Sequence, residues 1–185
     1  MQIKISAVQK IVYGSMFTVI SLILAFFIKF PVIPATPYLK FDISDVPVFV
    51  ATMLLGPQTG LSILLCVCTL RSILFSSAGI VGFVIRMTSA INVLFLGYLY
   101  NKPKNIVRTT LTIILSIFAC LIIKIPLNYV FWVYFWGIPK ANLDEFILSV
   151  IIPFNIIKII VNSVLSVYIS RVIEKFLSRN KFTYH

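Results

Sequence analysis

Long apolar segments recur along the chain, and short stretches that hold most of the charged residues separate them. The last segment, residues 151–168, reads IIPFNIIKIIVNSVLSVY and approaches the roughly 20 residues with which a helix crosses a bilayer. Of the 185 residues, 60% are hydrophobic and 11% are charged, which no soluble domain of this length requires. The sequence therefore predicts an integral-membrane protein, with residues 1–185 forming a single membrane domain.

Six segments are expected as membrane helices, at residues 11–28, 47–55, 61–75, 80–100, 109–130 and 151–169. This pattern predicts an all-α membrane protein with six transmembrane helices. Basic residues flank the segments on one side of the membrane, against the acid Glu174, at Lys4, Lys10, Lys102, Lys104, Arg108, Arg171, Lys175, Arg179 and Lys181. The positive-inside rule then places both termini in the cytoplasm, with the chain in the cell membrane. The net charge of +11 reflects this asymmetry and not a nucleic-acid partner.

The stretch between the first two expected helices breaks the helical pattern. Residues 29–46 read KFPVIPATPYLKFDISDV, and their three prolines exclude a regular helix. The acidic and aromatic residues that we expect to matter in this outer loop are Tyr38, Phe41, Asp42 and Asp45. A proline-stiffened loop of this kind is either a structured lid over a site or a simple connector.

Small residues recur every three or four positions along the expected first helix, at Gly14, Thr18, Ser21 and Ala25. Such a stripe permits close approach between helices in lipid. The sequence leaves two uses for it open, which are packing within the chain and docking onto another subunit.

No catalytic motif is present. The sequence lacks a His–carboxylate pair, an HExxH motif and a nucleophile elbow, and GPQTG at 56–60 lacks the lysine of a phosphate-binding loop. Cys66, Cys68 and Cys120 lie in apolar runs without metal-ligand spacing and are interpreted as packing residues. We therefore expect neither an enzyme nor a metal or cofactor, and ATP hydrolysis would need a separate protein.

Polar side chains inside the last segment are more informative. Asn155, Lys158 and Asn162 follow one another at spacings of three and four, so they share one helical face. Exposing that face to lipid would be costly, so it is expected to look into the protein. It is either a polar knot that joins helices or one wall of a binding site.

A second polar pair, Lys124 and Asn128, shares a face of the expected fifth helix. An asparagine amide offers a donor and an acceptor together, which suits the edge of a heterocycle, and a lysine can donate to a ring carbonyl. Of the basic residues within the apolar segments, Arg71 and Lys124 are expected to extend outward to the interface, whereas Arg86 and Lys158 are not.

Two stretches carry a family resemblance. KFPVIPATPYLKFDISDVPVFVATMLLGPQTG at 29–60 and IIPFNIIK at 151–158 resemble, in this order, the riboflavin-specific substrate-binding (S) components of energy-coupling factor (ECF) transporters. The resemblance covers most of the chain. It implies six helices, a vitamin site on the outer side, a lid loop between helices one and two, and a flavin as transported ligand. It further implies a location in a bacterial plasma membrane and energising by a separate transmembrane subunit and two ATPase subunits.

The resemblance also implies roles for individual residues. It assigns contacts with the flavin to Asn128, Asn155 and Lys158, and contacts with the transmembrane partner to Gly14, Thr18 and Ser21. One departure concerns helix three, where the family's Lys-Asn pair after GPxxG is replaced by CVCTLR at 66–71. An S component for another vitamin or heterocycle therefore remains an alternative, as does a membrane assembly protein without a transport role.

Overall fold

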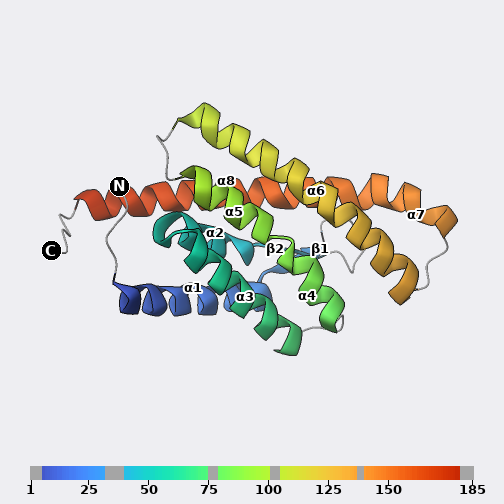
Figure 1. Ribbon diagram of the computed structural model, residues 1–185, viewed down its shortest axis with the longest axis horizontal. Helices are drawn as coiled ribbons and strands as arrows, with labels where there is room; N and C mark the ends of the chain where they lie inside the picture. Colours follow the sequence, from blue (N-terminus) through green and yellow to red (C-terminus); the bar gives the residue numbers. More distant parts are fainter. Residues whose placement is uncertain (1–5, 32–39, 75–78, 101–104, 137–139, 180–185) are drawn as a thin grey trace.

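The computed structural model describes residues 6–31, 40–74, 79–100, 105–136 and 140–179, which are helical apart from one short hairpin. Most of the helices lie along the long axis of the molecule, and the last of them, α8, extends over most of its length (Figure 1). The helices are α1 (Ala7–Phe27), α2 (Asp45–Leu55), α3 (Pro57–Leu74), α4 (Gly79–Met87), α5 (Ala90–Tyr100), α6 (Ile106–Trp136), α7 (Lys140–Phe146), the π-helical turn η1 (Ile147–Ile151) and α8 (Ile152–Arg179).

The expected membrane architecture is confirmed in outline. Within the described residues, five helical stretches are long and apolar enough to cross a membrane, at Ala7–Phe27, Pro57–Leu74, Gly79–Tyr98, Ile106–Phe131 and Leu143–Leu177. Their outward faces carry large apolar side chains, as at Phe27 and Ile73, which are each 74% exposed. Helix α2 is apolar but has 11 residues, about 16 Å of helix, which is shorter than the roughly 20 residues of a typical membrane-spanning helix.

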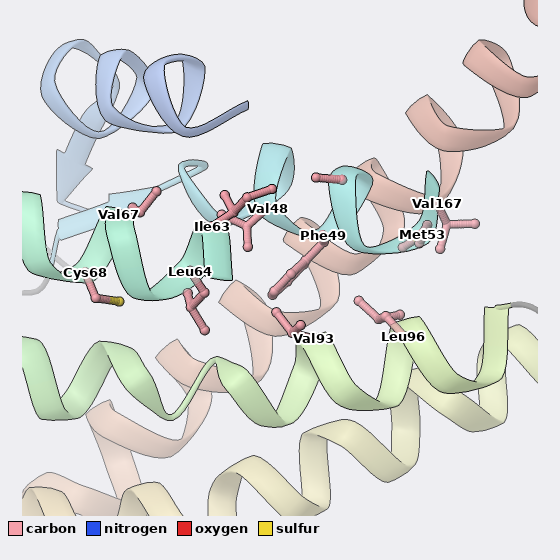
Figure 2. Close-up of a cluster of buried hydrophobic side chains, with 11 residues drawn as sticks. Val48, Phe49, Met53, Ile63, Leu64, Val67, Cys68, Val93, Leu96 and Val167 are labelled. Carbon is pink, nitrogen blue, oxygen red and sulfur yellow. The ribbon is translucent and has the colours of Figure 1, made fainter. Parts of the chain in front are cut away.

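Helix α2 instead lies inside the bundle. Its side chains meet those of α3, α5 and α8 in one cluster, in which Val48 and Phe49 are almost fully buried (Figure 2). The same cluster includes Cys68, which agrees with its interpretation as a packing residue, and Cys120 is likewise buried. Because α2 is covered on several sides, the segment that precedes it is fixed close to the centre of the molecule.

Glycines allow α3 and α5 to approach α2 closely. A Cβ atom on Gly60 would lie 2.0 Å from Oγ1 and 3.1 Å from Cα of Thr52. A Cβ atom on Gly97 would lie 2.7 Å from Cγ2 of Thr52 and 2.8 Å from Cβ of Pro57. Any larger residue at either position would therefore push α2 away from its neighbours.

We expect Gly60→Ala to lower the thermal unfolding midpoint in detergent, because overpacking typically costs about 1–3 kcal/mol. Gly14→Ala is the matched control. Its Cβ would lie 3.6 Å from the nearest atom, on Ile63, which is an ordinary contact. Both glycines are helical, so any gain in helix propensity is shared. Equal midpoints for the two variants would contradict the tight packing of α2 on α3.

Several expectations about local structure were wrong. The glycines at both ends of GPQTG, residues 56–60, predict a tight turn. Within this stretch Gly56 alone takes a left-handed conformation, with φ 102°, and α3 begins at Pro57. Proline suits the first position of a helix, where its missing N–H costs nothing. The expected fourth helix is divided by a turn at Thr88 and Ser89 into α4 and α5. Just after that turn, Asn92 of α5 accepts at Oδ1 from the Cys120 thiol of α6 at 3.3 Å.

The helices toward the end of the chain are longer than expected. Helix α6 continues past its expected end at residue 130 to Trp136. The polar residues 140–145, which suit a loop, form most of helix α7. Helix α8 begins at Ile152, which agrees with the expected start at residue 151, but it continues past the expected end at residue 169 to Arg179. Its polar residues in this part are compatible with a helix that leaves the apolar layer.

Candidate functional site

A short hairpin brings an acidic residue into the bundle. Strand β1 (Lys29–Pro31) pairs antiparallel with β2 (Lys40–Asp42), with Lys29 opposite Asp42. The sequence indicated that this stretch is not helical but not that it forms strands. Two residues after β2, Ser44 precedes the start of α2 at Asp45. Asp42 and Ser44 are both buried, so their polar groups need partners within the protein.

Those partners come from α3, from α1 and from the connection between β2 and α2. Arg71 donates from Nη2 to Asp42 Oδ2 at 3.1 Å and from Nη1 to the Ser44 hydroxyl, which in turn donates to Asp42 Oδ1. The Ser21 hydroxyl of α1 donates to the Ser44 carbonyl oxygen at 2.6 Å. Arg71 is 4% exposed, so the expectation that it extends outward to the interface was wrong. A buried carboxylate draws it inward instead.

Lys158 of α8 faces the same carboxylate. Its Nζ lies 3.5 Å from Asp42 Oδ2 and 3.9 Å from Asp45 Oδ2. Burial by itself would raise the pKa of the Asp42 carboxyl, but Lys158 and Arg71, with hydrogen bonds from Arg71 and Ser44, hold that pKa well below its ordinary value. Asp42 is therefore a carboxylate at any physiological pH.

The second polar group joins α6 to α8. Lys124 donates from Nζ to Asn155 Oδ1 at 3.1 Å and is 6% exposed, so the expectation that it extends outward was also wrong. Asn155 Nδ2 donates to the Ile151 carbonyl and Asn128 Nδ2 donates to the Lys124 carbonyl, each at 2.8 Å. These bonds gather two asparagine amides and Lys124 on the facing sides of α6 and α8.

The polar face expected on the last helix does point into the protein. Asn155 and Asn162 are 9% and 1% exposed, and the Lys158 side chain is 19% exposed. Asn128 and Asn155 are linked through Lys124, which contacts Asn155 directly and whose carbonyl accepts from Asn128. The structure thus brings these predicted residues to one region without testing their role.

The predicted lid and docking residues fall in different surroundings. Phe41 and Asp42 are buried, Asp45 is half-buried, and Tyr38 lies outside the described residues. On α1, Gly14 and Ser21 are buried against the bundle, whereas Thr18 is half-buried and donates to the Gly14 carbonyl at 2.8 Å. Docking of a partner on α1 stays a prediction.

Sequence reasoning missed Arg71 and Ser44 as members of these groups, and it paired Lys124 with Asn128 but expected the lysine to extend outward. A usable signal was present in Arg71 and Asp42, because a cation inside an apolar helix and an acid next to an apolar segment both need compensation. Within the described residues no three His, Cys, Asp or Glu side chains gather as metal ligands would. The chemistry available is hydrogen bonding and charge pairing.

Comparison with known proteins identifies the family. A family model described as the substrate-specific component of ECF transporters matches residues 9–170. The chain belongs to this family of ECF transporter S components. It is therefore a transporter component and not an enzyme.

Individual relatives agree with this membership. The chain is 35% identical to the riboflavin transporter RibU of Staphylococcus aureus (strain TCH60), over 92% of this chain and 93% of that protein. It is 31% identical to the riboflavin transporter FmnP of Bacillus subtilis (strain 168), over 85% of this chain and 87% of that protein.

The fold is also that of an S component. A solved structure of the S component of a bacterial ECF transporter superimposes with a TM-score of 0.76 at 30% identity, covering 93% of this chain and 99% of that chain. The arrangement of α1 to α8 is thus an S-component fold, and its hydrogen-bonded polar groups lie within the region that the family model matches.

Proposed function

We propose that this chain is the riboflavin-binding S component of an ATP-driven vitamin importer. The observation that carries the proposal is its similarity, over 92% and 85% of its length, to proteins named as riboflavin transporters. Riboflavin would be the transported ligand and not a cofactor. The whole chain, residues 1–185, would act as one substrate-binding membrane domain.

The polar groups on α6 and α8 suit the pyrimidine edge of a flavin, which alternates carbonyl oxygens with ring nitrogen. Each amide of Asn128 and Asn155 uses one N–H on a helix carbonyl, which leaves a second N–H for a ligand. Lys158 sits farther from both carboxylates than the roughly 2.8 Å of a tight charge-assisted hydrogen bond, so its ammonium can donate to a ring carbonyl. We propose these three residues as flavin contacts.

Energy for transport would come from partners. The sequence carries no nucleotide-binding motif, so we propose that a transmembrane subunit and two ATPase subunits of an ECF module act on this chain. The described start of α1 and end of α8 lie at the same end of the molecule (Figure 1). Basic residues in these parts, Lys10, Arg171 and Lys175, support a cytoplasmic location for both ends in a bacterial plasma membrane, with six passes in all.

Uptake by cells that lack their own flavin transporter tests the proposal. Cells expressing this chain together with an ECF module should accumulate radiolabelled riboflavin, and cells expressing the chain with an ATPase-inactive module should not. Excess unlabelled riboflavin should compete, while a panel of other vitamins should not. If another vitamin competes and riboflavin does not, the chain is favoured as an S component for that other vitamin, which is the alternative raised by CVCTLR at 66–71. If no vitamin is taken up, an assembly role is favoured.

A further inference from the structure

One carboxylate oxygen is shared between two cations. Asp42 Oδ2 accepts from Arg71 Nη2 at 3.1 Å and lies 3.5 Å from Lys158 Nζ. The other oxygen, Oδ1, accepts from the Ser44 hydroxyl, so it does not compete for Lys158. The side chains of Arg71, Asp42 and Lys158 are 5%, 8% and 19% exposed, so water screens these charges weakly.

The ion pairs of this cluster balance two cations, Arg71 and Lys158, against two carboxylates, Asp42 and Asp45. Arg86 of α4 is a further cation near enough to act on both carboxylates, but it is in none of these ion pairs. Arg71 makes the shorter contact with Asp42 and also holds Ser44. Lys158 is left 3.5 and 3.9 Å from the two carboxylates, distances beyond the roughly 2.7–2.9 Å of a charge-assisted hydrogen bond. Its charge is compensated, yet its N–H donors are not committed to either acid.

Removing Arg71 would change this balance. Among the described residues, Lys158, 3.5 Å away, would then be the cation that remains in an ion pair with the Asp42 carboxylate. Because water screens this site poorly, the attraction between the Asp42 carboxylate and the Lys158 ammonium would be strong, and Arg71 would no longer compete for the carboxylate. The ammonium would close on Asp42 Oδ2 and form a tight ion pair, and a ligand carbonyl would have to break that pair in order to bind.

We propose that Arg71 is a positioning residue, which neutralises Asp42 and so keeps the Lys158 ammonium available to the ligand. The inference rests on the proposed function, because it takes Lys158 as a contact of the bound flavin. It assigns a role in binding to an arginine that does not itself touch the ligand.

The test is a set of riboflavin titrations on purified protein. Arg71→Met should raise the dissociation constant about tenfold, the scale of one compromised hydrogen bond to a charged group. In a Lys158→Met background the same substitution should add no further loss, because it acts through that lysine. Adding Asp42→Asn to Arg71→Met should restore the affinity, because no carboxylate then captures Lys158. Arg108→Met, in the first turn of α6, controls for loss of an arginine as such.

Arg71→Met should fold, since Lys158 still compensates Asp42, and its melting midpoint without ligand checks this. If it does not fold, Arg71→Lys and the Arg71→Met/Asp42→Asn pair decide the matter, since both must bind nearly as tightly as the unmodified protein. An unchanged affinity in Arg71→Met, losses that multiply with Lys158→Met, or a failed rescue would each overturn the inference. Normal binding by Lys158→Met would overturn it together with the proposed contact, whereas no riboflavin binding by the unmodified protein would reject the function itself.

Discussion

Replacing Lys158 with methionine should weaken riboflavin binding by about ten- to hundred-fold and leave the fold intact. Loss of one partner of a buried hydrogen bond costs roughly 1–3 kcal/mol, which converts to that change in dissociation constant. The fold should survive because Asp42 keeps Arg71 and Ser44 as partners when the lysine is gone. Methionine also preserves the length and the apolar stem of the side chain. Isothermal titration in detergent gives the affinity, and gel filtration reports the fold.

Lys175→Met is the control for this prediction, because it removes a lysine from the same helix at an exposed position. It should bind riboflavin as the unmodified chain does. If Lys158→Met aggregates while the remaining soluble protein binds normally, the polar residues of α8 only join helices. If both variants fold and bind normally, the flavin does not contact Lys158.

Thr18→Leu should abolish uptake through the ECF module while leaving riboflavin binding unchanged. Of the three small residues proposed for docking, Gly14 and Ser21 are buried within the bundle, and Thr18 is the one that reaches the surface. A leucine there would prevent a partner helix from approaching closely. The hydroxyl that is lost bonds the Gly14 carbonyl of the same helix, so its removal leaves no distant group without a partner.

Thr110→Leu provides a matched control on α6, where the threonine is exposed and also bonds a carbonyl of its own helix, that of Ile106. Transport of radiolabelled riboflavin and binding by purified protein should both be normal in this variant. Normal transport by Thr18→Leu would remove α1 as the docking face. Gly14→Leu is unsuitable for this test, because the added atoms would meet Ile63 and Thr59 inside the bundle.

The sequence predicted those features that depend on spacing along one helix. Asn155, Lys158 and Asn162 were expected on one inward face, and they lie there because three- and four-residue spacings align side chains on any helix. The apolar helices were recognised for a similar reason, since length and hydropathy decide membrane insertion. Their ends were not, because the polar stretches at 140–145 and 171–179 are compatible with either loop or helix.

Features that depend on contacts distant in the chain were not predictable. The partner of Arg71 is Asp42, 29 residues earlier, and a cation near the end of an apolar helix more commonly extends to the interface. Lys124 similarly bonds Asn155, 31 residues later. The turn at Thr88 and Ser89 lacks a proline or glycine that would mark it. It is accompanied by bonds from Cys120 to Asn92 and from Ser89 to Asp45 at 3.5 Å.

Titration of riboflavin with the purified chain in mild detergent tests the central claim most directly. Because ring stacking and burial quench flavin emission, the fluorescence of riboflavin should fall until one equivalent of protein has been added. The protein should then elute with the yellow absorbance of the flavin and melt at a higher temperature. Unchanged flavin emission, together with a melting temperature that riboflavin does not raise, would contradict the assignment of this S component to riboflavin.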